Sequence, residues 1–387
     1  MDGQFRVDVA LRGGRLRFEP DWPPLDQITG HLTFERASFS AAIDGATLHG
    51  VQTAGTRLRI PDFHHGVLGI EGRTTAPASR LIGLVNASPL DHFVNGALRE
   101  ASATNDVDLK LSARIPLHAG EHDTFQATLA LHDNDFLFGP GKPVLGALRG
   151  VLAIGHDGVA ARDVSGRLLG GPVRIDASAP APGHVTLRAR GGLSLDGLRT
   201  LADNPLTRKL DGHADYEADV DIDARGVKLT LSSDLVGVAS DLPAPFAKRT
   251  GVALPLRVVS SPAPVAADGF VTTISLGDAV RMRIARRFDA KAGRALIDRA
   301  AFAMNTEPVL PETGLSVALH LPRVDFDAWG AAMATAAIGQ PDENLGGEFA
   351  PGFSLLPKHV SVLTDELLVG GKQLHDVVFG ATRQQGV

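Results

Sequence analysis

The sequence predicts a mainly β protein built from many short strands. Apolar and polar residues alternate over many stretches, and glycine and proline, 43 and 24 of the 387 residues, separate these stretches. Aromatic residues are scarce, at 5% of the chain against 44% for all hydrophobic residues. Because aromatic side chains bury the most area each, apolar burial must come mainly from leucine, valine, isoleucine and alanine. Such a composition suits many strands joined by short turns.

The alternation is clearest in three stretches of the chain. Apolar residues occupy every second position in Phe5 to Leu11, in Val107 to Ile115 and in Ala214 to Ile222. A side-chain period of two is typical of a strand with one apolar face. Turn signals at Gly13-Gly14 and Asp44-Gly45 predict that the chain reverses there. We therefore expect a meander of short, closely spaced strands.

Short helical segments are predicted between the strands. The first covers Arg80 to Val85, and Ser88 can cap a second one directly after it. The apolar face of this second helix would comprise Leu90, Phe93, Val94, Ala97 and Leu98. Further helical segments are expected within Leu195 to Leu210 and from Val324 onward.

A weak internal repeat relates two of these helical segments. Asn204-Pro205-Leu206 matches Ser88-Pro89-Leu90, and a clear strand follows each match. Repeats of this kind make structures in which each unit contacts mainly its neighbours. We therefore expect one continuous segment over residues 1–387. Its repeat units would be roughly 1–100, 101–212 and 213–330, with an incomplete unit at 331–387.

Charge and composition argue against several classes of function. The formal net charge is −6, and acidic and basic residues are interspersed. The sequence has no basic stripe that would indicate binding to nucleic acid. The chain has no cysteine, which excludes disulfides, thiolate metal sites and cysteine nucleophiles. No stretch approaches the roughly 18 consecutive apolar residues of a membrane-spanning helix. The first residues also lack the features of a signal peptide.

One basic patch interrupts this even distribution of charge. It comprises Arg281, Arg283, Arg286 and Arg287, among the apolar residues Val280, Met282 and Ile284. The alternation favours the solvated face of a strand. The alternative is a site for phosphate headgroups.

The sequence contains no catalytic constellation, so we predict a protein that is not an enzyme and uses no cofactor or metal. The glycines of Gly166 to Pro172 lack the spacing and the following helix of a phosphate-binding loop. His64-His65 lacks the spacing of metal ligands. Asp219, Asp221 and Asp223 share one strand face, where regular alternation favours a solvated surface over acid/base chemistry.

The most individual stretch of the chain is Leu-Pro-Ala-Pro at residues 242–245. Each proline fixes its own φ and lacks a backbone donor, and Pro245 biases Ala244 toward an extended conformation. Local physics therefore predicts a rigid extended corner that ends one strand. We expect the sheet to resume near Ala253 to Val258.

This stretch resembles the hallmark of the YhdP group of AsmA-like envelope proteins, in which Ser-x-Leu-x-Gly is followed by Leu-Pro-x-Pro and a lysine. The matching residues are Ser233, Leu235, Gly237, Leu242, Pro243, Pro245 and Lys248. Other resemblances follow in the family's order over roughly residues 5 to 330. They comprise Trp22-Pro23, Ser88-Pro89-Leu90, Ile115-Pro116-Leu117, Asp163, Leu169 to Pro172, Leu210, Gly212, Tyr216 and Leu321 to Trp329. Their collinearity makes the match fairly specific.

The resemblance implies a long curved, mostly antiparallel sheet that forms an open apolar groove. It also implies non-enzymatic transport of phospholipid between the inner and outer membranes by a periplasmic bridge of Gram-negative bacteria. Members of this family have an N-terminal membrane anchor, so we expect this chain to be a central fragment that ends mid-fold. Its partners would be phospholipid acyl chains and, through the anchor, the inner membrane.

Sequence alternation leaves one alternative open, a structural or scaffold β-protein whose apolar faces form a packed interior. In the groove hypothesis, inward side chains would line the groove. The expected lining residues are Val107, Leu109, Leu111, Ile115, Val220, Ile222, Leu229 and Leu231. We expect the motif residues Leu242, Pro243, Pro245 and Lys248 to have a structural role. A carbohydrate-active β-protein is disfavoured, because stacking aromatics and paired cleft carboxylates are not evident.

Overall fold

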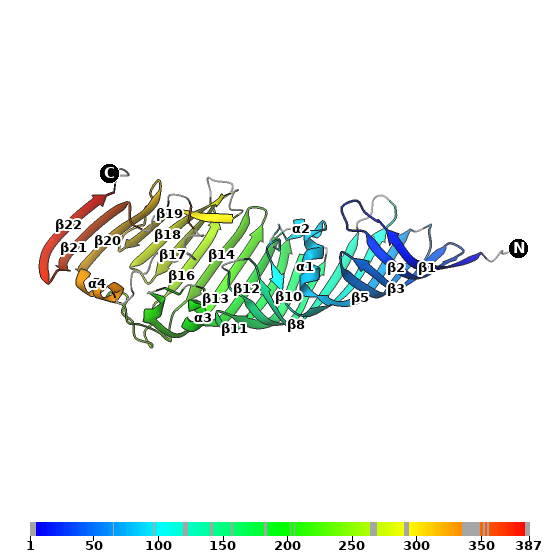
Figure 1. The fold of residues 1–387 in the computed structure, drawn as a ribbon, viewed down its shortest axis with the longest axis horizontal. Helices are drawn as coiled ribbons and strands as arrows, with labels where there is room; N and C mark the ends of the chain where they lie inside the picture. Colours follow the sequence, from blue (N-terminus) through cyan, green and yellow to red (C-terminus); the bar gives the residue numbers. More distant parts are fainter. Residues whose placement is uncertain are drawn as a thin grey trace. The chain divides into compact units, whose positions relative to one another are not determined.

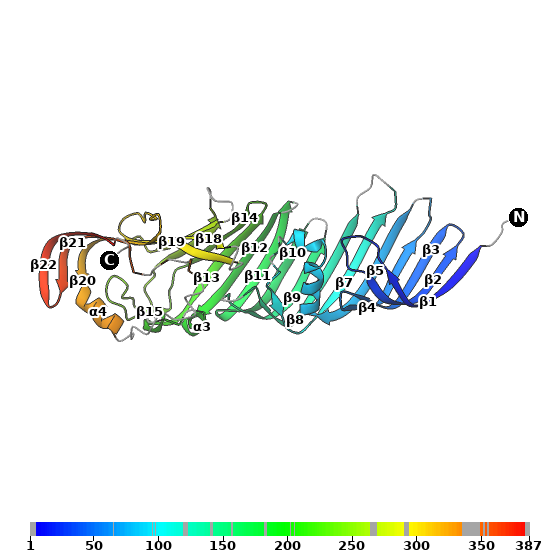
Figure 2. The same cartoon turned by 45° about the horizontal axis from the view of Figure 1, so that its top comes forward.

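The computed structural model describes residues 5–383 except 65, 95, 97, 119–122, 140–141, 156–157, 182–183, 202, 205, 264–268, 290–293, 335–348, 351–352 and 354–355. His65, Ala97 and Pro205, which the sequence interpretation used, therefore lie outside the described residues. The predicted class is confirmed, since the chain is mainly β and its strands form one mostly antiparallel sheet with a few short helices (Figures 1 and 2).

The chain divides into two compact units, which are described separately. The first contains residues 1–168 and 172–187, and the second contains residues 169–171 and 188–387. The predicted repeat boundaries stay predictions.

The first unit is a meander of antiparallel strands. Its strands are β1 (Arg6–Leu16), β2 (Leu25–Glu35), β3 (Ser38–Leu48), β4 (Val51–Ile60), β5 (Val67–Pro77), β6 (Ser102–Ala103), β7 (Asp106–Pro116), β8 (Thr124–Leu137), β9 (Leu145–Gly155) and β10 (Gly158–Leu168). Two further strands, β11 (Gly170–Ala181) and β12 (His184–Ser194), contribute residues to both units. The described ladder runs from β1 through β5 to β7 and on to β10, and β6 pairs with β8.

The strands of the first unit are longer than predicted, because bulges stand where the sequence predicted turns. β1 continues through Gly13-Gly14 and β3 continues through Asp44-Gly45, and both ladders only shift register there. Gly13 adopts a φ of 67°. A positive φ suits a bulge as well as a turn, so the glycine signal alone could not separate the two. The chain reverses instead at residues 17–24 and at His49-Gly50.

Two helices belong to the first unit, α1 (Ala78–Asn86) and α2 (Leu90–Phe93). The first confirms the helix predicted at Arg80 to Val85, whereas the second is shorter than predicted and ends at Phe93. The Ser88 hydroxyl, which was predicted to cap the second helix, donates to the Val85 carbonyl at 3.2 Å.

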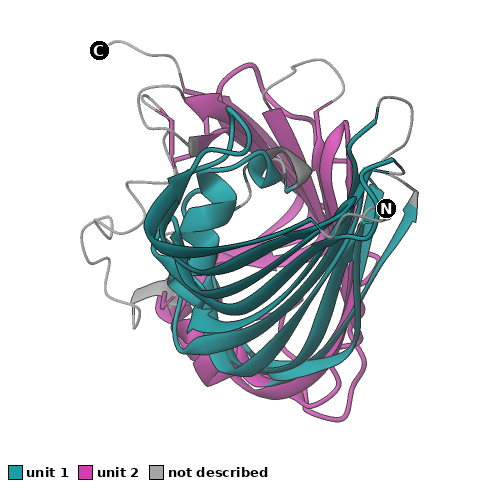
Figure 3. Ribbon diagram, turned by 90° about the vertical axis from the view of Figure 1, so that its right-hand side faces the viewer, with its two compact units in different colours: residues 1–168, 172–187 teal, residues 169–171, 188–387 magenta. Residues whose placement is uncertain are grey.

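Helix α1 packs against one face of the sheet. Ala78 and Leu81 contact a buried apolar cluster of Val107, Leu131, Leu148, Ala161, Val164 and Ala177. In Figure 3 the strands of this unit, in teal, curve, and the helix lies within the curve. The helix therefore covers part of the concave face.

The second unit is also a meander, but it contains two parallel pairs of strands before its last antiparallel pair. Its strands are β13 (Leu210–Asp223), β14 (Gly226–Ser233), β15 (Val238–Ser240), β16 (Leu256–Pro262), β17 (Gly269–Leu276), β18 (Val280–Asp289), β19 (Arg294–Met304), β20 (Gly314–Asp325), β21 (His359–Val369) and β22 (Lys372–Thr382). Strand β14 pairs directly with β16, and β15 pairs with the start of β13. The β19–β20 and β20–β21 pairs are parallel, whereas the other described pairs are antiparallel.

The helical segments of the second unit are α3 (Leu195–Arg199), the single turn η1 (Thr207–Lys209) and α4 (Phe326–Ala334). Ser194 caps α3 by accepting a hydrogen bond from the Gly197 amide at 3.0 Å. Val324, where the last helical segment was predicted to begin, still belongs to β20. Among the described residues, no helix has both the length and the apolar character that crossing a bilayer requires.

Candidate functional site

The concave face of the first unit carries apolar side chains in rows that cross the strands. Residues paired across an antiparallel ladder point to the same face, so the register assigns each row. One row comprises Val9, Leu32, Ala41, Leu58, Ile70, Ala113 and Phe125. A second row comprises Leu111, Ala127, Ile154 and Val159. A third comprises Leu109, Leu129, Leu152 and Ala161.

The apolar face of the first unit is only partly covered. Val107 is 1% exposed because it lies in the cluster beneath α1. Leu109 is half-buried, and Leu111, further along the same strand, is 37% exposed. This face is thus closed at the α1 end of the strands and becomes accessible away from it.

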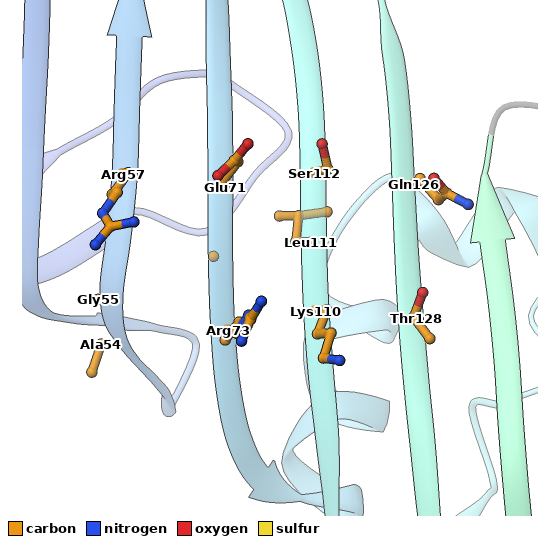
Figure 4. A pocket seen from close by; sticks show the side chains of 11 residues that line it. Ala54, Gly55, Arg57, Glu71, Arg73, Lys110, Leu111, Ser112, Gln126 and Thr128 are labelled. Carbon is orange, nitrogen blue, oxygen red and sulfur yellow. The ribbon is translucent and has the colours of Figure 1, made fainter.

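The opposite face of the same strands is polar. It holds a hollow of about 680 Å³, and Arg57, Glu71, Arg73, Lys110 and Thr128 are among its lining residues (Figure 4). The hollow lies where β4 bulges between Ala54 and Arg57. In Figure 4 the helices lie behind the strands, on the far side from these polar side chains. Most residues that line the hollow therefore belong to the polar face, although Leu111 of β7 also contributes to the lining.

The second unit also has one apolar face, formed by β13, β14, β16, β17 and β18. One row across these strands comprises Ala218, Leu231, Val258, Ile274 and Met282. The neighbouring row comprises Val220, Leu229, Ser260, Thr272 and Ile284. Tyr216 lies on this face at the α3 end of β13 and is 3% exposed. Burial raises the pKa of its phenol, whose oxygen has no hydrogen-bond partner among the described residues.

The eight predicted lining residues all lie on these apolar faces. In the first unit, Leu109 is paired with Leu129, Leu111 with Ala127, and Ile115 with Leu68. In the second unit, Val220 is paired with Leu229, Ile222 with Val227, and Leu231 with Ala218. Val107 differs from the other seven, because α1 covers it.

The carboxylates singled out in the sequence lie on the other face of β13. Asp219 accepts a hydrogen bond from Arg188 at 3.0 Å, and Glu217 forms an ion pair with Arg190 at 3.0 Å. Asp223 accepts a hydrogen bond from Arg225 at 2.6 Å. Both members of the Arg188–Asp219 pair are more than half exposed, so this is a solvated ionic surface of small energetic weight. This arrangement agrees with the predicted solvated strand face.

The Leu-Pro-Ala-Pro stretch forms a closed loop, which differs from the extended corner predicted for it. Ser240 and Lys248 exchange two backbone hydrogen bonds, at 2.9 and 3.1 Å, and the Phe246 amide donates to the Pro243 carbonyl at 3.0 Å. The prolines end the strand as predicted, and the sheet resumes at Leu256. Leu242 is buried at 9% exposure, so the loop is tied to the protein by an apolar side chain as well.

Lys248 holds the base of this loop together. Its ammonium donates to the carbonyls of Leu235 at 2.8 Å and Val238 at 2.7 Å. Burial lowers the pKa of this ammonium, and the charge of Asp234 opposes that shift. Leu235 has a positive φ of 52°, which directs its carbonyl away from regular strand geometry. The lysine therefore gives these backbone carbonyls a charged hydrogen-bond donor at the base of the loop.

A second signature segment meets the same loop. The Trp329 indole of α4 donates to the Ala244 carbonyl at 3.3 Å, and its ring packs edge-on against Phe246 with centroids 5.7 Å apart. Asp327, on the same helix, accepts hydrogen bonds from the Gly370 and Gly371 amides at 2.7 and 2.8 Å. Sequence reasoning identified both segments but could not predict that they are in contact.

Among the described residues, apolar side chains predominate on both faces. Among the described residues, no cluster of three or more histidine, aspartate or glutamate side chains could hold a metal ion. Both faces offer apolar surface along the strands, and α1 covers part of this surface in the first unit. Such a surface can bind a hydrocarbon chain by burial alone.

Comparison with known proteins agrees with this picture. A family model described as YhdP protein matches residues 1–387. A curated relative, the intermembrane phospholipid transporter YhdP of Escherichia coli (strain K12), is 26% identical over 389 residues. This alignment covers 97% of the chain but only 29% of the relative. No solved structure matches the chain.

Proposed function

This chain belongs to the YhdP protein family, and we propose that it binds phospholipid acyl chains along the apolar faces of its sheet. It would serve as one segment of a bridge that carries phospholipid between the inner and outer membranes. The observation that supports this proposal most is the rows of apolar residues on one face of long strands. Several of these residues are partly exposed. Each acyl CH₂ that leaves water contributes about 0.8 kcal/mol, so such a face needs no polar motif to bind lipid.

The proposed location is the periplasm. The relative's name supports transport between membranes, and the chain spans 29% of that relative's length. We propose that the full-length protein is anchored in the inner membrane, as the family resemblance implies. We propose a non-enzymatic role, because the carboxylates noted in the sequence lie on the solvated face of β13.

Native mass spectrometry of the purified 387-residue chain tests this proposal. We expect adducts with the masses of phospholipids after purification from a bacterial envelope. Delipidated protein should regain these adducts when it is incubated with phosphatidylglycerol or phosphatidylethanolamine vesicles. A chain that stays free of lipid in both experiments would refute the proposed function.

The second candidate function is that of a structural or scaffold β-protein. The buried clusters favour it, since one surrounds Val107 under α1 and another joins Ile28, Ala41, Ile43 and Ala46. Such a protein would use its apolar faces only for internal packing. It should therefore bind no lipid and should unfold when a charge is placed on these faces.

A further inference from the structure

The four arginines of the basic patch lie on two different faces of the second unit. Arg281, Arg283 and Arg287 are on the polar face of β18, where Arg281 forms an ion pair with Glu307 at 3.0 Å and Arg287 with Asp298 at 3.4 Å. Arg286 is on the apolar face, two residues after Ile284 and directly opposite Phe270 of β17. The predicted solvated strand face therefore fits three of the four.

Arg286 has apolar neighbours in the adjacent strands. Phe270 is its cross-strand partner in β17, and the buried Ile297 is its partner in β19. On this face of β13, β14, β16, β17 and β18, Arg286 is the one charged side chain among the described residues. No described carboxylate lies within ion-pair distance of it. A half-buried cation in such surroundings carries a desolvation cost that an anionic ligand would offset.

Two hydroxyl groups extend the polar spot around Arg286. The arginine Nη1 donates to Thr272 Oγ1 at 2.9 Å, and Thr272 Oγ1 donates to Ser260 Oγ at 3.1 Å. Thr272 is only 7% exposed, so its hydroxyl fixes the guanidinium rather than binding a ligand itself. Four of the five arginine N–H groups and the Ser260 hydroxyl have no acceptor among the described residues. These donors suit a ligand that has two or more anionic oxygens.

The position of Arg286 along its strand suits a headgroup site. β16 ends at Pro262, β17 begins at Gly269 and β18 ends at Asp289, so the arginine is close to the ends of these strands. From Arg286 back to Val280 the apolar face extends for about 20 Å at roughly 3.3 Å per residue. One leaflet of a bilayer contributes about half of the roughly 30 Å hydrocarbon core. The strand is therefore long enough to contact the whole acyl chain of a phospholipid whose phosphate lies at Arg286.

We propose that Arg286, fixed by Thr272 and assisted by Ser260, binds the phosphate of a phospholipid whose acyl chains lie on the apolar face. This inference rests on the proposed function and adds a headgroup subsite to it. Arginine binds phosphate through two parallel N–H···O hydrogen bonds, which are stronger than neutral ones. The site contacts only the phosphate of the headgroup. It should therefore bind any glycerophospholipid more tightly than a neutral lipid of the same chain length.

The test compares two lipids with identical acyl chains on the full purified chain. Dioleoylphosphatidylglycerol and dioleoylglycerol are offered in matched detergent micelles, and bound lipid is counted by native mass spectrometry. The variants are Arg286→Gln, Arg286→Lys and the control Arg283→Gln, which removes a charge from the polar face of the same strand. Circular dichroism and thermal melting establish that each variant is folded.

We expect the unaltered protein and Arg283→Gln to prefer the phospholipid by at least about tenfold, the factor that a single charge-assisted hydrogen bond would give. Arg286→Gln should lose this preference yet still load dioleoylglycerol, and Arg286→Lys should retain part of it. The headgroup subsite would be refuted if Arg286→Gln still preferred the phospholipid, or if the unaltered protein showed no such preference. Either result would leave the proposed lipid binding unaffected.

A separate titration with inorganic phosphate, followed by ³¹P NMR, distinguishes the source of the anion. If the chain loads neither lipid, the proposed function fails. Phosphate binding that depends on Arg286 would then support an anion site for free phosphate, whereas no phosphate binding would overturn the subsite as well.

Discussion

Lys248 shows how a single signature residue can be structural. Its ammonium donates short hydrogen bonds to the carbonyls of Leu235 and Val238, in the backbone leading into the Leu-Pro-Ala-Pro loop, and a longer one of 3.4 Å to the carbonyl of Arg249. The sequence placed the lysine in a family motif, but the partners of its two short hydrogen bonds are ten and thirteen residues away along an irregular backbone. Contacts of this kind depend on how the loop closes, and local pattern does not reveal that. The structural role predicted for Lys248 stays a prediction, which the following substitution tests.

Replacing Lys248 with methionine should lower the free energy of unfolding by about 2 kcal/mol, because two charge-assisted hydrogen bonds to partly buried carbonyls are lost. Urea denaturation measures this change. Lys228→Met is the matched control, since Lys228 is exposed on the polar face of β14. Equal stability of the two variants would contradict the role assigned to Lys248.

At the scale of elements, most strands follow from alternation, and the errors have a common cause. Bulges at Gly13-Gly14 and Asp44-Gly45 use the same residue types as turns, so strand length was underestimated. Alternation also could not predict strand direction. Apolar and polar residues alternate in a parallel pair such as β19–β20 as they do in an antiparallel pair. The period-two alternation identifies the apolar face of a strand, but it does not identify the strand that pairs with it.

The hallmark glycine Gly237 marks a place where two strand ends approach closely. It has a φ of 100°, and a Cβ there would lie 2.3 Å from the His213 carbonyl oxygen. Gly212 lies across from it, where a Cβ would be 2.1 Å from the Gly237 carbonyl oxygen. The glycine requirement at this junction is therefore conformational and steric together.

The Gly237→Ala variant should lose at least about 2 kcal/mol of stability, because both the backbone conformation and the carbonyl contact are incompatible with a methyl group. Gly251→Ala is the control, since no atom lies within 4 Å of a Cβ at that position. Thermal unfolding of the two variants gives the comparison. A Gly237→Ala variant as stable as its control would show that the backbone adjusts at little cost.

At the scale of the molecule, the question is whether the apolar faces pack only against protein or also against lipid. Seven of the eight predicted lining residues lie on these faces outside the α1 cluster, and that much followed from alternation. Alternation could not predict that α1 covers Val107. That contact joins a helix to the sheet, and a pattern within one strand carries no information about it. Register and burial thus assign the faces, and substitutions can establish what contacts them.

Placing a charge on the apolar face separates a groove from a packed core. Leu229→Asp should leave the melting temperature nearly unchanged but reduce phospholipid loading, because an unpaired carboxylate there disfavours the acyl chain while its own half-buried position remains hydrated. Lys228→Asp, on the other face of the same strand, should leave loading unaltered. Unfolding of Leu229→Asp would instead favour the scaffold alternative.

The most direct measurement of the central claim is site-specific photo-crosslinking to phospholipid at adjacent positions of β7. A benzophenone amino acid would replace Leu111, on the apolar face, or Ser112, on the polar face, and both positions are exposed. Irradiation with vesicles, followed by mass spectrometry, would detect covalently attached lipid. We predict phospholipid adducts at Leu111 and none at Ser112. Equal labelling of both positions, or labelling of Ser112 alone, would contradict lipid binding on the apolar face.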